Sequence, residues 1–159
     1  MKRVTYISTS RKIGHEEVNE LTETSAKNNQ RKHVTGVLLH LGSIFFQVIE
    51  GPVEAIDELW AKILADPRHE EVVVLKTELD VQHRLFGTWS MRIVDLNRLQ
   101  EIDEKELNEV VLEPVRVLLQ TVTESYSILE KYTQATIFKI IQSGTFVVSS
   151  AFGFVTNAN

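Results

Sequence analysis

The stretch SIFFQVIEG, from Ser43 to Gly51, most constrains the fold, because it has the composition of a buried β-strand. Side chains alternate between the two faces of a strand, so Gln47 shares a face with Phe45 and Ile49 and is expected in an apolar interior. A buried carboxamide without hydrogen-bond partners would cost about 1 to 3 kcal/mol. Partners for Gln47 must therefore come from elsewhere in the protein or from a bound molecule.

Short strands and amphipathic helices are expected on both sides of this stretch. Gly42-Ser43 is a hairpin signal, and Gly51-Pro52 suits the start of a helix. The expected elements, in order, are a strand at Arg3–Ser8, a helix with Val18, Leu21, Ser25 and Asn29 on one face, strands at Thr35–Leu41 and Ile44–Glu50, a helix from Pro52 to Asp66, and strands at Glu71–Thr77 and Trp89–Val94.

This β-α-β-β-α-β-β order predicts an α+β fold of the ferredoxin-like type, with two helices on one face of a mixed sheet. In that arrangement the first and third strands lie side by side at the centre of the sheet. Tyr6 and Gln47 are then on neighbouring strands, and one register directs both side chains into the space beneath the helices.

The composition is that of an ordinary globular protein, with 43% hydrophobic and 25% charged residues among 159. The formal net charge of −5 and the lack of a Lys/Arg run argue against binding to nucleic acid or to an anionic membrane. The absence of cysteine excludes disulfides and thiolate metal ligands. Because no signal peptide or apolar spanning segment is visible at the N-terminus, a cytoplasmic location is the default expectation.

Polar residues from three expected elements lie on faces whose other residues point inward. They are Tyr6, Ser25, Asn29 and Gln47. One interpretation is a structural hydrogen-bond network within the core. The other is a site for a planar polar ligand, whose edge would meet the carboxamides and the phenol while Leu21 and Ile63 clamp its faces. The pattern alone leaves both open.

Other motifs are weaker. His15-Glu16-Glu17 lacks the second histidine of a helical zinc site, since position 19 is Asn19, and no metal site is predicted. Arg68-His69 fits either a phosphate contact or a solvated turn. Trp89 and Met91 are compatible with simple core filling.

Five stretches together resemble the BLUF family, which comprises blue-light sensors that use flavin. In order they are RVTYIS, SAKNNQRKHVTGVLL, FFQVIEGP, ILADPRH and GTWSMRIV, from Arg3 to about Val94. The resemblance implies a non-covalent flavin, FAD or FMN, between the two helices. It implies that Tyr6 is the photochemical electron donor, Gln47 the switching amide beside flavin N5 and O4, and Asn29 the amide at the pyrimidine edge.

The same resemblance places Trp89 and Met91 at positions whose environment changes with light. The cofactor contacts that it implies are Leu21, Ser25, Lys27, Asn28, Asn29, Gln47, Ile63, Asp66, Arg68 and His69.

The stretch PVRVLLQTVTESYSILEKYTQATIFKIIQSGT resembles the segment that joins BLUF domains to the catalytic part of photoactivated adenylyl cyclases. Helices are expected at Glu101–Leu112 and from Pro114 to about Tyr132. The second helix carries an apolar stripe at coiled-coil spacing, here called the output stripe, made of Val115, Leu119, Val122, Tyr126 and Leu129. We expect this stripe to form a homodimer and to signal to a downstream effector, and the alternative is that it packs on the open side of the sheet.

The chain is accordingly expected to contain a flavin-binding photosensor at 1–97, a helical linker and dimerisation segment at 98–145 and an uncharged tail at 146–159. No cyclase is expected within it, because paired metal-binding aspartates are lacking, so the predicted role is sensing and not catalysis. Two rival functions remain at this point. One is a ferredoxin-like regulatory domain that binds a small metabolite without flavin, and the other is an acyl-phosphate hydrolase, for which Ile7–Gly14 lacks the glycine pattern.

Overall fold

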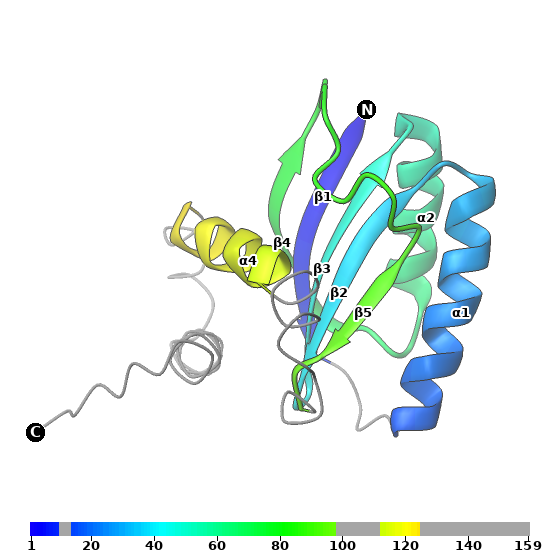
Figure 1. Cartoon of the computed structure of the whole chain (residues 1–159), viewed down its shortest axis with the longest axis vertical. Coiled ribbons are helices and arrows are strands. Elements are labelled where there is room, and N and C mark those ends of the chain that lie inside the picture. The colour runs from blue at the N-terminus through cyan, green and yellow to red at the C-terminus, as the bar shows by residue number, and fades with distance from the viewer. Residues whose placement is uncertain (10–13, 98–111, 125–159) are drawn as a thin grey trace, which may run out of the picture.

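The computed structural model describes residues 1–9, 14–97 and 112–124, and within these it contains seven elements of one α+β unit followed by a further helix (Figure 1). They are β1 (Lys2–Thr9), α1 (His15–Arg31), β2 (Thr35–Leu41), β3 (Ile44–Gly51), α2 (Val53–Ala65), β4 (Glu70–Glu78), β5 (Arg92–Asp95) and α4 (Leu112–Glu124). The predicted β-α-β-β-α-β-β order is confirmed, and most boundaries agree within one or two residues.

The five strands form one mixed sheet in the order β4-β1-β3-β2-β5. β3 lies between β1 and β2 and is antiparallel to both, which is the split βαβ arrangement of the ferredoxin-like fold, while β5 is parallel to β2. The predicted fold class is therefore confirmed. In the central pair Tyr6 lies directly opposite Gln47, so the two polar residues face the same side of the sheet.

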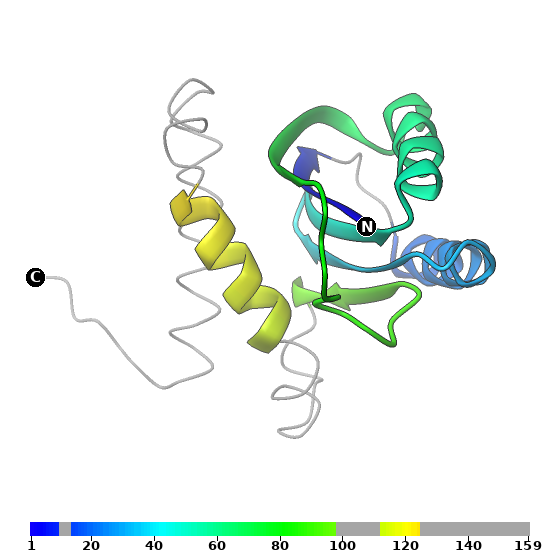
Figure 2. The same cartoon turned by 90° about the horizontal axis from the view of Figure 1, so that it is seen from above.

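Two helices cover one face of the sheet, and α4 lies on the other (Figure 2). Beneath α1 and α2, the helix-face cluster packs around Tyr6, Phe45, Ile49 and Ile56. The opposite face, here called the back face, carries a second cluster that includes Phe46, Val48, Phe86, Val115 and Val117. Both faces of the sheet are thus dry at its centre, which explains why β1, β2 and β3 contain nearly continuous buried runs.

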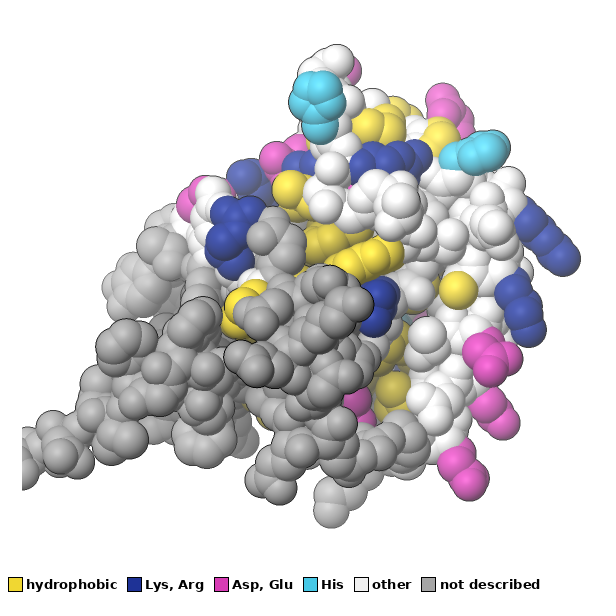
Figure 3. All heavy atoms as spheres, viewed as in Figure 1, with side chains coloured by type: hydrophobic (Ala, Val, Ile, Leu, Met, Phe, Trp, Pro, Cys, Tyr) yellow, Lys and Arg dark blue, Asp and Glu magenta, His cyan; other side chains and the backbone are white. Residues whose placement is uncertain are grey.

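The two helices of the helix face differ in how strongly they pack. α2 buries Ile56 and Ile63, whereas α1 buries Val18 and, near its C-terminal end, Asn29. The outward side of α1 is rich in Glu, Lys and Arg, and Figure 3 shows acidic and basic side chains gathered along that edge of the molecule. Among the described residues, no helix combines the length and apolar character needed to cross a membrane.

The fifth strand begins at Arg92, so the predicted start at Trp89 is wrong. The carbonyl oxygens of Trp89 and Ser90 accept hydrogen bonds from the Gly36 amide and from the Asn29 side chain. These bonds fix Trp89 and Ser90 in the loop that precedes β5. Residues 79–91, here called the crossing segment, pass from β4 across one end of the sheet to β5 (Figure 1).

The output stripe is only partly described by the structure. Val115 is 3% exposed and packs in the back-face cluster, so it contacts the chain's own sheet. This is the alternative interpretation of the helix, and the prediction that Val115 lies in a dimer contact is corrected. For Leu119 and Val122 the structure describes no side chain, and Tyr126, Leu129, most of the helix expected at Glu101–Leu112 and the tail at 146–159 lie outside the described residues.

Gly36 provides a test of how closely β2 and β3 approach each other. A Cβ at this position would lie 2.3 Å from the backbone oxygen of Val48, which cannot move without breaking the strand pair. We expect Gly36→Ala to lower the free energy of unfolding by about 2 kcal/mol or more. Gly87→Ala is the control, because no atom of the described residues lies within 4 Å of its added Cβ. Urea denaturation of the two variants measures both effects, and an equal loss would contradict the tight approach at Gly36.

Candidate functional site

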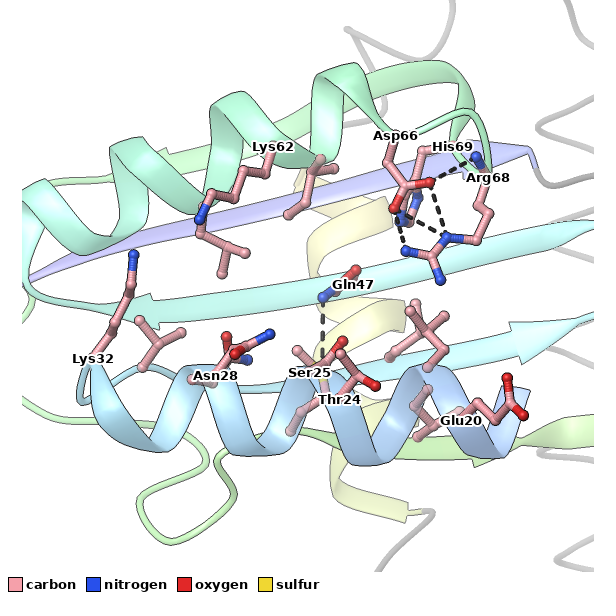
Figure 4. A pocket seen from close by; sticks show the side chains of 18 of the residues that line it. Glu20, Thr24, Ser25, Asn28, Lys32, Gln47, Lys62, Asp66, Arg68 and His69 are labelled. Atoms are coloured by element: carbon pink, nitrogen blue, oxygen red, sulfur yellow. Dashed lines mark hydrogen bonds and ion pairs between the residues drawn. The ribbon is translucent and has the colours of Figure 1, made fainter. Parts of the chain in front are cut away.

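A cavity of about 490 Å³ opens between α1 and α2 above the middle of the sheet (Figure 4). All of the predicted cofactor contacts except Lys27 line it, as does Met91. Leu21 and Ile63 lie on the two opposite helices, as expected for residues that clamp a flat molecule. The structure therefore brings the predicted side chains together, and their role as ligands stays a prediction.

Gln47 lies at the floor of this cavity and is paired with Tyr6. The Tyr6 hydroxyl donates a hydrogen bond of 2.5 Å to Gln47 Oε1, while Gln47 Nε2 lies 3.8 Å from the sulfur of Met91. The Gln47 oxygen thus has a strong donor, but its amino group has a weak acceptor. A polar ligand in the cavity would supply the better partner.

Tyr6 is completely buried beneath the cavity. Its ring meets Trp60 edge-to-face at a centroid separation of 5.0 Å and the His69 ring at 5.9 Å. Burial, together with the charge of Asp66, raises the pKa of the Tyr6 phenol well above its ordinary value. The phenol is therefore held neutral, and any electron taken from it would leave a strongly acidic proton directed at Gln47.

Asp66, Arg68 and His69 form a cluster at one end of the cavity (Figure 4). Arg68 donates through Nε and Nη2 to the Asp66 carboxylate, and this hydrogen bonding lowers the pKa of Asp66 and raises the pKa of Arg68. Burial lowers the pKa of His69, with Arg68 acting in the same direction and Asp66 against it. His69 Nδ1 lies 2.8 Å from Ser8 Oγ, which fixes the imidazole beside Tyr6.

The carboxamides of α1 line the cavity wall. Asn29 is buried and donates from Nδ2 to the Ser90 carbonyl oxygen at 2.8 Å, while Asn28 and Ser25 face the cavity from the same helix. Lys27 does not line the cavity, because it lies on the outward side of α1, where its side chain is 74% exposed and pairs with Glu23. Lys27 could contact a ligand only through a part of that ligand that extends out of the cavity to the exposed side of α1.

Trp89 lies away from the cavity. It stacks on Phe86 at 5.6 Å, carries the Arg92 guanidinium at 5.1 Å from its ring and packs against the back-face cluster. Met91, two residues later, belongs to the helix-face cluster and contacts Gln47. The two residues that were predicted to respond to light thus lie on opposite faces of the sheet.

Some residues of the site were not predicted as part of it. Lys32 and Lys62 line the end of the cavity away from Arg68, and both pair with Glu58 (Figure 4). The contact of Trp60 with Tyr6 was not predicted from the sequence either. The two lysines could have been predicted from the sequence, because Lys62 is adjacent to Ile63 and Lys32 lies three residues after Asn29. The Trp60 contact could not, because it depends on how α2 is placed over β1.

The cavity fits a planar heterocycle with a polar edge. Gln47, Asn28 and Asn29 offer amide donors and acceptors, apolar side chains line both helices, and cationic groups lie at both ends. A flavin has this combination of a flat ring, a hydrogen-bonding edge and a phosphate-bearing chain. Among the described residues there is no cluster of three or more histidine or acidic side chains that could hold a metal ion.

Comparison with known proteins identifies the same chemistry. The family model for BLUF, described as sensors of blue light using FAD, matches residues 1–92. Photoactivated adenylate cyclase subunit alpha of Euglena gracilis is 30% identical over 136 residues, which cover 83% of this chain and 12% of that protein. The chain thus spans only a small part of this curated relative.

Solved structures with the same fold are similar over most of the chain. The structure of a bacterial light-regulated adenylyl cyclase has a TM-score of 0.63 and 41% sequence identity, covering 90% of this chain and 39% of the cyclase. The dark-state structure of the BLUF protein BlrB has a TM-score of 0.60 and 34% identity, covering 79% of this chain and 96% of BlrB.

The buried His69 predicts a pH dependence of stability. The pKa of His69 is lower in the folded protein than in the unfolded chain. The contribution of His69 to the free energy of unfolding is therefore complete above about pH 6.5, the unfolded pKa, and is lost as the pH falls toward the folded pKa. We expect the urea midpoint of the wild type to fall between pH 7.5 and 5.5, and to fall less in His69→Asn. Asp66 does not affect the comparison, because its pKa is lowered from 3.8 and its carboxyl group therefore titrates below pH 5.5. An equal fall in both proteins would contradict the assigned burial effect.

Proposed function

This chain belongs to the BLUF family of sensors of blue light using FAD, and we propose that it signals by a light-driven rearrangement of the Tyr6–Gln47 hydrogen bond beside a non-covalent flavin. The BLUF domain is a photosensor domain and not a catalytic one. Family membership favours this function over a flavin-free metabolite sensor or an acyl-phosphate hydrolase. The observation that carries the proposal is the buried 2.5 Å bond from the Tyr6 hydroxyl to Gln47 Oε1 at the floor of the cavity.

When bound, the flavin supplies a strong oxidant on absorbing blue light. Tyr6 is placed to give up an electron, and the proton that it then loses has Gln47 Oε1 as its acceptor. The surrounding apolar cluster excludes water from this exchange, so the proton stays on the path between the two side chains. When electron and proton return to Tyr6, the Gln47 amide is left rotated or tautomerised, with its hydrogen bonds changed.

The other cavity residues are proposed to hold the cofactor. Asn29 and Asn28 meet the pyrimidine edge, Leu21 and Ile63 contact the two ring faces, and the ends of the cavity supply charge. Lys32 and Lys62 at one end and Arg68 at the other suit an anionic phosphate. These contacts are common to FAD and FMN, so they favour flavin as a class and leave either as the proposed cofactor.

Signal output is proposed to pass through the back face to the helical segment at 98–145. Val115 and Val117 of α4 pack in the same cluster as Phe86, which stacks on Trp89. The remaining positions of the output stripe, from Leu119 onward, are proposed to pair two copies of the chain and to connect them with an effector. The proteins to which this chain is similar include photoactivated and light-regulated adenylyl cyclases, which makes a cyclase the proposed effector class.

The photochemical proposal is tested by absorption spectroscopy of the purified protein before and after blue light. We expect a yellow protein whose visible band shifts reversibly to the red, with the flavin identified by mass after release. Tyr6→Phe and Gln47→Leu should keep flavin but lose this shift, because each removes one partner of the 2.5 Å bond. Trp60→Phe is the matched control for an aromatic neighbour of Tyr6 and should retain the shift. A normal shift in Gln47→Leu would exclude the amide switch, and a colourless wild type would exclude the flavin.

The dimer proposal is tested by light scattering at matched concentration. We expect the wild type to be a dimer and Leu119→Glu/Val122→Glu to be a monomer that still photocycles, because charges on a paired helix seam prevent its burial. Gln120→Glu, at an exposed position of the same helix, is the control. A monomeric wild type, or a dimeric double variant, would contradict pairing through this stripe.

A further inference from the structure

The crossing segment, residues 79–91, contacts both faces of the sheet. Its Phe86 lies in the back-face cluster together with Val115 and Val117 of α4, and Trp89 packs against that cluster. Its last residue, Met91, lies in the helix-face cluster beside Gln47. A displacement of this segment would therefore change contacts both beside the cavity and beside α4.

Glu50 holds the crossing segment to the sheet. It is completely buried on the back face at the end of β3, and its carboxylate accepts four hydrogen bonds. Oε1 accepts from the Phe86 amide at 2.8 Å and the Thr35 hydroxyl at 3.2 Å, while Oε2 accepts from Arg3 Nε at 2.9 Å and the Leu85 amide at 3.1 Å. One side chain thus joins β1, β2 and the crossing segment to β3.

Two arginines extend this attachment. Arg84, in the crossing segment, donates to the Glu50 carbonyl oxygen at 3.0 Å, to the Thr35 hydroxyl at 2.7 Å and to the His33 carbonyl oxygen at 2.6 Å. Arg3 donates to the His83 carbonyl oxygen at 2.8 Å in addition to its bond with Glu50. The bonds to residues 83–86 all lie at the same end of the sheet, so Glu50 is the centre of a cluster that fixes where the segment crosses.

We propose that Glu50 is a positioning residue of the photoswitch, which acts through the crossing segment by holding Met91 against Gln47 and coupling that contact to the α4 face. Its action on the photocycle rests on the proposed function of Gln47. The cluster itself stands on its own geometry, because it lies on the opposite face from the cavity and does not line it.

Glu50→Gln separates positioning from mere space filling, because it keeps the shape of the side chain. A carboxamide has one acceptor oxygen, and its amino group would face two of the four donors that now reach the carboxylate. Either orientation leaves two donors without an acceptor, and one of them is a crossing-segment amide. Thr35→Val is a second variant, which removes one donor to the carboxylate and one acceptor of Arg84 and leaves the carboxylate in place.

The experiment measures dark recovery after blue light, with hydrogen exchange at the Leu85 and Phe86 amides. We expect Glu50→Gln to change the recovery rate about tenfold, in the same direction as Met91→Ala, and Thr35→Val to change it about threefold in that direction. Combining Glu50→Gln with Met91→Ala should add less than about twofold to Met91→Ala alone, because both act through one contact. Exchange at Leu85 and Phe86 should rise in Glu50→Gln. Glu78→Gln is the matched control, since Glu78 also binds Arg3 but, within the described residues, accepts no hydrogen bond from an amide of the segment; its recovery rate should stay within about twofold of the wild type.

Each outcome bears on the proposal separately from the proposed function. A wild type without a photocycle would overturn the function, while the exchange measurement would still report whether Glu50 holds the segment. A photocycling Glu50→Gln with wild-type recovery and unchanged exchange would overturn the positioning role. Fully additive rate effects of Glu50→Gln and Met91→Ala would also overturn it, because Glu50 would then act by another route. Should Glu50→Gln not fold, wild-type recovery in a folded Thr35→Val would overturn the proposal.

Discussion

The hydrogen bond between Tyr6 and Gln47 is the interaction on which the rest of this structure depends. It joins the two central strands at directly opposed positions, and both side chains are buried between a sheet and two helices. A buried phenol and a buried carboxamide each need hydrogen-bond partners. The Tyr6 hydroxyl pairs with the oxygen of Gln47 but not with its amino group. The amino group of Gln47 is left beside a thioether at the floor of a cavity, which is where a polar cofactor edge would be most strongly felt.

The surrounding fold keeps this pair dry and connects it with distant parts of the chain. α2 places Trp60 and the Asp66–Arg68 pair around Tyr6, and α1 supplies amides on the facing wall. The same sheet has a second dry face, against which α4 packs, so a change at Gln47 does not have to cross water to reach the helix. The physical route between the faces is the crossing segment, held at the sheet's end by the Glu50 carboxylate.

Much of this arrangement could be predicted from the sequence. Alternation around Gln47 and the β-α-β-β-α-β-β order together placed Tyr6 next to Gln47, because the split βαβ topology leaves few other strand orders. Trp60 beside Tyr6 could not be predicted, since it depends on the placement of α2 and not on its periodicity. Glu50 was also missed, because two of its four donors are backbone amides 35 and 36 residues away, which have no side-chain signature. The spacing of the output stripe did not distinguish a partner helix from the chain's own sheet, and Val115 is buried against the sheet.

The most direct test of the account is light-minus-dark infrared difference spectroscopy on protein labelled with ¹³C at the glutamine side-chain carbonyl. If light rearranges the bond between Tyr6 and Gln47, the difference spectrum contains a carbonyl band that moves with the label and is missing from Gln47→Leu. That result is the one the account predicts. A reversible red shift of the flavin band without any glutamine-sensitive carbonyl band would contradict it, because the light signal would then form without a change at Gln47.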